Sequence, residues 1–189
     1  MSSRSDQDLI ISYLESSDGD ALAELVQRHL KSVYSFASIF AKDTAIAEDI
    51  TQEVFIKVWK NLKKFDQKQK FQTWLLTITK NTALDYLRKK KAKVFSSFED
   101  EVGQNPLVDS LVSLEPLPEE IFEAQERSEE LVQVIKTLED KYRVLFLLRL
   151  ANDLSLAEVA QVLGEPLETV KTRYRRGLIK LKEKLIHEP

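Results

Sequence analysis

The stretch SLAEVAQVLGEPLETVKTRYRRGLIKLKEKL, residues 155–185, predicts two helices joined by a tight turn. Ser155 and Glu158 have the S-x-x-E spacing of a capping box, in which each side chain satisfies an unpaired backbone N–H at the start of a helix. Apolar residues then recur at helical spacing, and Gly164 suits the left-handed residue that ends a helix. Pro166 suits the first turn of the second helix, where its missing N–H costs nothing. The stretch therefore predicts a helix-turn-helix.

The second of these helices has an apolar side and a basic side when it is plotted at about 100° per residue. The apolar side carries Val170, Tyr174, Leu178, Leu181 and Leu185. The opposite side carries Glu168, Thr172, Arg175 and Arg176, with Lys171 and Arg173 on its flanks. Arginine pairs bidentately with guanine and lysine neutralises phosphates, so this side suits the major groove of DNA. The alternative is a solvated basic surface helix.

The composition narrows the class of protein. A chain of 189 residues suits one large domain or two small ones. It has no cysteine, which excludes disulfides and thiolate metal sites. It has no long uncharged apolar run, and the N-terminal MSSRSDQDLI lacks the apolar core of a signal peptide. We therefore expect a soluble, cytoplasmic protein with no membrane insertion.

Charge is distributed unevenly along the chain. Residues 57–93 contain twelve Lys or Arg against two acids, and residues 99–140 contain thirteen acids against two bases. Residues 171–184 are basic again, with seven Lys or Arg against one acid. Two positive segments with an acidic connector suggest two contacts on one polyanion, although two ordinary solvated faces would give the same pattern.

The periodicity predicts an all-α fold of two small domains. Residues 1–92 are expected to form an N-terminal helical domain, 93–118 a flexible acidic linker, and 119–189 a C-terminal helix-turn-helix domain. In the first domain, Ile46, Ile50, Val54, Val58 and Leu62 form a stripe that Phe55 and Trp59 broaden, and residues 63–70 form a polar loop. His29 is expected to be a packed or surface residue. Phe71 and Trp74 suit either a core or contacts with unstacked bases.

Three segments together resemble a bacterial RNA polymerase sigma factor of the extracytoplasmic-function subfamily. They are DITQEVFIKVW (residues 49–59), FQTWLLTITKNTALDYLRKKK (residues 71–91) and the terminal helix-turn-helix, in this order and spacing. The resemblance covers nearly the whole chain apart from the linker. It implies promoter recognition and initiation, with no catalytic residue, no metal, no cofactor and no enzymatic activity of the chain itself.

The resemblance also implies roles for single residues. Asp49, Gln52 and Glu53 would bind the clamp helices of the polymerase β′ subunit. The loop of residues 63–70 and the helix after it would open the DNA strands at the −10 element. They would contact this element through Lys63, Lys64, Lys68, Lys70, Asn81, Asp85 and Arg88. The last helix would contact the −35 element through Lys171, Thr172, Arg173, Arg175 and Arg176. Further partners implied are promoter DNA, the polymerase β flap and an anti-sigma factor.

Two positions depart from the pattern of the family. Glu168, where relatives often carry a small residue, puts a negative charge near the groove. Gly177, where alanine is frequent, is expected to loosen the helix by about 1 kcal/mol.

Two other classes of protein fit parts of the sequence. One is a dimeric helix-turn-helix repressor or activator, which would bind paired half-sites. The other is a nucleic-acid enzyme with a DNA-binding tail, for which Glu48, Asp49 and Glu53 are the candidate metal ligands.

Overall fold

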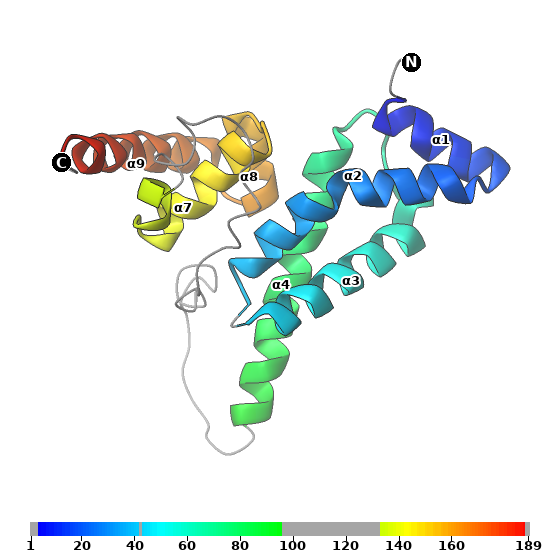
Figure 1. Ribbon diagram of the computed structural model, residues 1–189, viewed down its shortest axis with the longest axis horizontal. Helices are drawn as coiled ribbons and strands as arrows, with labels where there is room; N and C mark the ends of the chain where they lie inside the picture. Colours follow the sequence, from blue (N-terminus) through cyan, green and yellow to red (C-terminus); the bar gives the residue numbers. More distant parts are fainter. Residues whose placement is uncertain (1–3, 42, 96–132, 188–189) are drawn as a thin grey trace.

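The computed structural model describes residues 4–41, 43–95 and 133–187, and these ranges contain helices and no strand (Figure 1). The first half consists of α1 (Asp6–Ser16), α2 (Gly19–Ser38), α3 (Thr44–Asn61), a 3-10 turn (Leu62–Lys64) and α4 (Phe71–Phe95). The second half consists of α7 (Asp140–Phe146), a π-helical turn (Leu147–Ala151), α8 (Leu156–Leu163) and α9 (Leu167–His187). The predicted all-α fold is confirmed.

The predicted domain boundaries are only partly covered by the described residues. Helix α4 continues to Phe95, past the expected end of the first domain at residue 92. Most of the predicted linker and residues 119–132 of the predicted second domain lie outside the described residues. The division into 1–92, 93–118 and 119–189 stays a prediction.

Short polar side chains start the helices of the first half. Asp18 caps α2 and Asp43 caps α3, each accepting hydrogen bonds from backbone N–H groups of the first turn. The cap of α1 is Ser5, which forms a capping box with Asp8. The predicted stripe of α3 is buried at all five positions: Ile46, Ile50, Val54, Val58 and Leu62.

An aromatic cluster anchors the start of α4. The ring centroids of Phe65 and Phe71 are 5.5 Å apart, and those of Phe71 and Trp74 are 5.8 Å apart. The ring of His29 packs edge-on against Phe71, and its Nε2 lies 2.7 Å from a carboxylate oxygen of Asp6. His29 is therefore a packed residue, as expected. Phe71 is 4% exposed, so it is a core anchor and cannot stack on a base.

The second half contains the predicted helix-turn-helix. Ser155 and Glu158 form the capping box of α8, and Gly164 ends it with φ +70°. Helix α9 begins at Leu167, directly after Pro166. Before the helix-turn-helix, α7 is followed by the π-helical turn, which ends at Ala151, before Asn152. Figure 1 shows α7, α8 and α9 grouped together, with α8 beside α4.

The packing face of α9 differs from the predicted one. Val170 and Leu181 are buried as expected, but Leu178 is 42% exposed and Leu185 is 37% exposed. The face runs instead through Val170, Tyr174, Gly177 and Leu181. At Gly177 the rings of α7 come so close that an added Cβ would lie 3.0 Å from Phe146 Cε2 and 3.1 Å from Tyr142 Cδ1. Gly177 therefore permits the close approach of α7 and α9. The sequence indicated only its lower helix propensity and not this packing role.

Replacing Gly177 by alanine is therefore expected to lower the stability of the protein. Alanine gains about 1 kcal/mol of helix propensity, but overpacking against two buried rings costs about 1–3 kcal/mol. We expect a net loss of about 1 kcal/mol in the free energy of unfolding, measured by urea denaturation. Gly19→Ala is the matched control, because nothing lies within 4 Å of its added Cβ. A Gly177→Ala chain more stable than the native chain would contradict this packing.

Glu139 joins α7 to α9 through two lysines. Its carboxylate lies 2.6 Å from Lys141 Nζ and 2.9 Å from Lys180 Nζ. Hydrogen bonds from Lys141 and then Lys180 lower its pKa from 4.5 to about 2. A carboxylate with a lowered pKa stabilises the folded state above its unfolded pKa, and this contribution disappears as the pH falls through the folded pKa.

We expect Glu139→Gln to lower the midpoint of thermal unfolding slightly at pH 7, since exposed ion pairs contribute little. The difference from the native chain should shrink as the pH falls from 4.5 to about 2. Thermal unfolding of the native and Glu139→Gln chains over this pH range tests both expectations. Glu15→Gln, at an exposed carboxylate of α1, is the control. A difference that stays constant over the range would show that the two lysines do not hold this carboxylate.

Candidate nucleic-acid and polymerase interface

Helix α9 presents a polar face directly opposite its packed face. Val170 and Leu181 are buried in the second half, and the ring of Tyr174 lies 5.5 Å from that of Phe146. Because these contacts fix the rotation of the helix, its other side faces solvent. The exposed side chains there include four of the five predicted −35 residues: Lys171, Thr172, Arg175 and Arg176.

Arg173 differs from the other four. Its guanidinium lies against the Glu165 carboxylate, with Nη1–Oε1 at 3.1 Å and Nη2–Oε2 at 2.8 Å. The side chains are 21% and 10% exposed, respectively. A paired arginine of this kind fixes the turn to the helix. Glu168, in contrast, is exposed and accepts a hydrogen bond from Lys171 Nζ at 2.7 Å.

A groove of about 520 Å³ runs beside this polar face. Its walls come from α7 and α9, and they contain Lys141, Tyr142, Glu168, Thr169, Thr172, Arg173 and Arg176. Lys141 and Thr169 were not predicted as site residues, because the pattern of α9 alone does not show which residues of α7 lie next to it. The groove extends the basic surface from α9 onto α7.

Helix α3 carries the predicted polymerase-binding residues on its solvent side. Asp49 and Gln52 are exposed, and Glu53 is half-buried and lies 3.0 Å from Lys57 Nζ. Ile56 and Trp59 are 49% and 58% exposed. The spacing of three and four residues places these side chains along one face.

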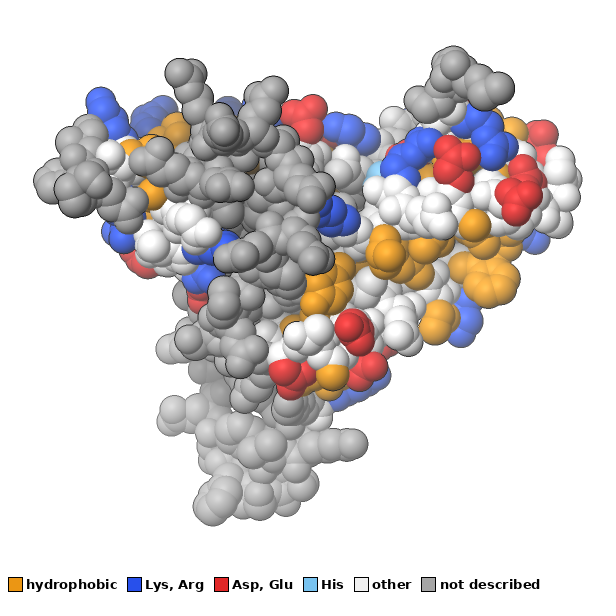
Figure 2. Space-filling view, viewed as in Figure 1, with side chains coloured by type: hydrophobic (Ala, Val, Ile, Leu, Met, Phe, Trp, Pro, Cys, Tyr) orange, Lys and Arg blue, Asp and Glu red, His pale blue; other side chains and the backbone are white. Residues whose placement is uncertain are grey.

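Trp59 is exposed, so the prediction that it broadens the buried apolar stripe is wrong. Its indole N–H donates to the hydroxyl of Tyr13 on α1, while most of the ring faces solvent. Figure 2 shows hydrophobic side chains gathered on the side of the molecule formed by α2 and α3. Exposed aromatic side chains are enriched at protein interfaces.

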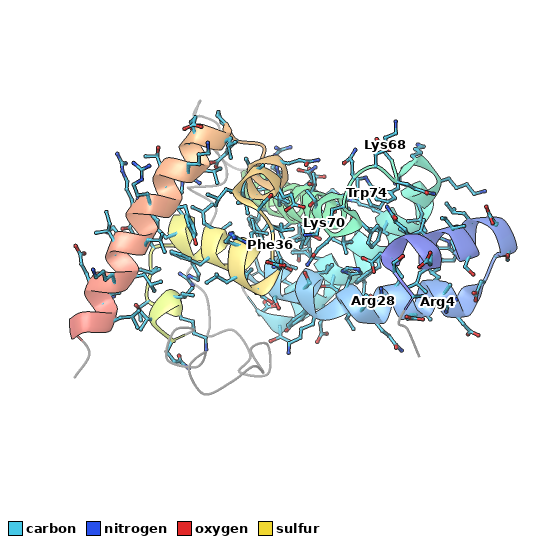
Figure 3. The ribbon with its side chains drawn as sticks, turned by 90° about the horizontal axis from the view of Figure 1, so that it is seen from above. Arg4, Arg28, Phe36, Lys68, Lys70 and Trp74 are labelled. Atoms are coloured by element: carbon cyan, nitrogen blue, oxygen red, sulfur yellow. The ribbon has the colours of Figure 1, made fainter. Side chains whose placement is uncertain are left out.

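The predicted −10 residues lie on the loop before α4 and along α4. Lys63 and Lys64 are exposed on the 3-10 turn, and Lys68 and Lys70 are exposed on the loop before α4. Lys68 points away from the fold in Figure 3. Asn81, Asp85 and Arg88 are exposed on one face of α4, with Asp85 and Arg88 at 3.6 Å. The predicted residues thus form two groups, one before α4 and one along α4, and Lys80, next to Asn81, is buried.

The described residues, 4–41, 43–95 and 133–187, contain no candidate metal site and no candidate membrane-spanning helix. Within these ranges no three acidic or histidine side chains lie together as metal ligands. No helix in the described part of the chain is long and apolar enough to cross a bilayer.

Comparison with known proteins gives the family. Residues 25–93 match Sigma-70 region 2, and residues 128–181 match Sigma-70, region 4. The chain is 34% identical over 176 residues to the ECF RNA polymerase sigma factor SigW of Bacillus subtilis, which covers 93% of this chain and 94% of that one.

Two solved structures share the fold. One is the sigma factor RpoE of Bartonella quintana with the anti-sigma factor NepR, at a TM-score of 0.62, 21% identity and coverage of 88% of this chain and 98% of that chain. The other is CnrH with the cytosolic domain of CnrY, at a TM-score of 0.61, 22% identity and coverage of 97% and 99%. With both conserved regions matched and a relative aligned over nearly its full length, the chain belongs to the ECF family of RNA polymerase sigma factors, the non-enzymatic subunits that recognise promoters and begin transcription.

Proposed function

We propose that three surfaces of this chain divide the work of promoter recognition. The exposed face of α9 contacts the −35 element, the lysine loop and the polar face of α4 contact the −10 element, and α3 binds the polymerase core. The observation that carries the proposal is the geometry of α9. Its base-facing groups, Thr172, Arg175 and Arg176, lie opposite a face sealed against α7.

The groove beside α9 suits the DNA backbone. Arg176 and Thr172 border it on one side and Lys141 borders it on the other, so a phosphate strand can lie between cationic and hydroxyl groups. Arg173, paired with Glu165, positions the turn at the edge of the groove. Base contacts then come from α9, and backbone contacts come from both helices.

Strand opening at the −10 element is driven by binding energy in this proposal. Capturing an unstacked base offsets a cost of a few kcal/mol for each flipped base. The exposed lysines of residues 63–70 attract the displaced strand, and Asn81, Asp85 and Arg88 offer donors and acceptors to the bases.

Two further parts of the proposal concern partners and place of action. RpoE of Bartonella quintana was solved with an anti-sigma factor, and CnrH was solved with the cytosolic domain of CnrY. We propose that this chain also has an anti-sigma partner and that it acts in the cytoplasm. The polymerase β flap is the further contact expected for the second half.

DNase footprinting of the chain with core RNA polymerase tests the proposed function. Promoters selected by transcription should show two unlike protected elements, one contacted by each half of the chain. A palindromic footprint made by the chain without polymerase would instead support a dimeric repressor or activator.

A further inference from the structure

Two glutamates stand at the start of α9, and their surroundings differ. The side chain of Glu165 is 10% exposed, and both of its oxygens lie against the Arg173 guanidinium. Glu168 lies in the first turn of α9, and its side chain is 81% exposed. Its Oε1 lies 2.7 Å from Lys171 Nζ, and no group within the described residues binds its Oε2. Glu165 therefore belongs to the packing of the turn, whereas Glu168 keeps an acceptor for a partner.

Glu168 shares a face of α9 with groups that we propose to face the bases. Residues four apart lie on one side of a helix, so Glu168, Thr172 and Arg176 form a row. All three are exposed, and all three border the groove of about 520 Å³. Figure 3 shows α9 at the edge of the molecule. The row begins with a side chain that only accepts hydrogen bonds and ends with one that only donates them.

Lys171 makes a carboxylate tolerable on a surface that binds DNA. An acid near phosphates is repelled unless its charge is balanced, and the ammonium group at 2.7 Å supplies that balance. A carboxylate has about four acceptor positions, so the bond to Lys171 leaves room for a donor on the DNA. The ammonium group has three N–H donors, and one bond to Glu168 leaves two for a phosphate.

The bases differ in what they offer to a carboxylate in the major groove. Guanine presents the acceptors N7 and O6, and thymine presents the acceptor O4, so both repel it. Adenine has an amino donor, but its N7 acceptor lies beside that donor. Cytosine presents its N4 amino donor alone, and it is the base that glutamate and aspartate bind in protein–DNA complexes. An exposed carboxylate with a free oxygen therefore favours cytosine.

We propose that Glu168 is a specificity-determining residue, which accepts a hydrogen bond from the N4 amino group of a cytosine in the −35 element while Lys171 balances its charge. A helix in the major groove advances by about three or four residues for each base pair. Arg176 follows Glu168 by eight residues, which places the cytosine about two or three base pairs from the base that Arg176 contacts. This assignment rests on the proposed contact of α9 with the −35 element.

Selection of promoters by the complete chain with core RNA polymerase tests the proposal. The DNA is a promoter with a randomised −35 region, and the bound fraction is sequenced. The native chain should favour cytosine at one position by at least about fivefold. Glu168→Gln should move the preference at that position to adenine, because glutamine pairs with N6 and N7 of adenine. Glu168→Ala should remove the preference there and keep it elsewhere.

The matched control is Glu183→Gln, the same change of charge about four turns further along α9. It should leave every base preference unchanged. A carboxylate in the first turn also complements the helix dipole, and removal of an acid reduces repulsion from phosphates, but these effects are the same on all sequences. A Glu168→Gln chain whose overall affinity changes while its preference at every −35 position stays native would overturn the proposal.

The selection also separates this proposal from the proposed function. Arg176→Ala identifies the position that Arg176 contacts. If that variant relaxes one position and the Glu168 variants alter none, α9 contacts the −35 element and only the role of Glu168 fails. If the native chain enriches no −35 sequence, both the role of Glu168 and the proposed function fail. A cytosine two or three base pairs from the Arg176 position, switched to adenine by Glu168→Gln, would support both.

Discussion

Alanine in place of Arg176 is expected to weaken binding to one base pair of the −35 element and to relax the preference at that position. The side chain is exposed on the face of α9 opposite the buried Val170 and Leu181. In the proposed complex, its guanidinium therefore extends into the major groove of the DNA. A bidentate contact with guanine is worth about 1–3 kcal/mol, or roughly 5- to 150-fold in affinity. Replacing the preferred base should have little further effect on the variant.

Lys182→Ala is the matched comparison. Lys182 is exposed and lies nearly two turns further along α9. A helix that enters the major groove of DNA by its N-terminal end has moved away from the bases at this point. Its loss should weaken binding equally on all sequences and reduce the salt slope by about one unit, as for a phosphate contact.

The measurement is binding of the chain with core polymerase to single-base −35 variants at several salt concentrations. The complete chain is needed because the second half shares its core with the first. Equal, sequence-independent losses for Arg176→Ala and Lys182→Ala would mean that α9 supplies only charge.

Changing Asp49, Gln52 and Glu53 together to alanine is expected to lower the affinity for core polymerase by at least about 2 kcal/mol, or roughly 30-fold. The fold should be unaffected, because Asp49 and Gln52 are exposed and Glu53 is paired only at the surface with Lys57. Surface substitutions of this kind change stability by about 0.5 kcal/mol or less.

The exposed aromatic on the same face gives a second, independent test. Trp59→Ala should also weaken binding to core polymerase, since exposed tryptophans often dominate interfaces. Titration of core polymerase with labelled chain gives the affinities, thermal unfolding checks the fold, and Glu15→Ala on α1 is the control. Native affinity in both the triple variant and Trp59→Ala would remove α3 from the polymerase interface.

Local signals in the sequence predicted the elements of the fold well. The capping box of Ser155 and Glu158, the left-handed Gly164 and the apolar stripe from Ile46 to Leu62 are all read from patterns of a few neighbouring residues, and all are confirmed. The contribution of Gly177 to the packing face of α9 could not be predicted, because this residue has no side chain and leaves no mark on a hydrophobic pattern. The space at Gly177 is filled by Phe146 and Tyr142, which are distant in sequence.

In the candidate site, too, some features follow from local sequence and others depend on residues that are distant in sequence. The exposed positions of Lys171, Thr172, Arg175 and Arg176 follow from helical periodicity. The burial of Lys80, by contrast, depends on the carbonyl of Leu163, which lies 83 residues away. Removal from water lowers the pKa of Lys80, an effect that no local pattern could indicate.

Transcription in a reconstituted system tests the central claim most directly. The purified chain is combined with core RNA polymerase and a library of genomic fragments, and transcript start sites are sequenced. We predict starts that depend on the chain and that share two unlike upstream elements at fixed spacing, near −35 and −10. Transcription that is the same with and without the chain would contradict the account.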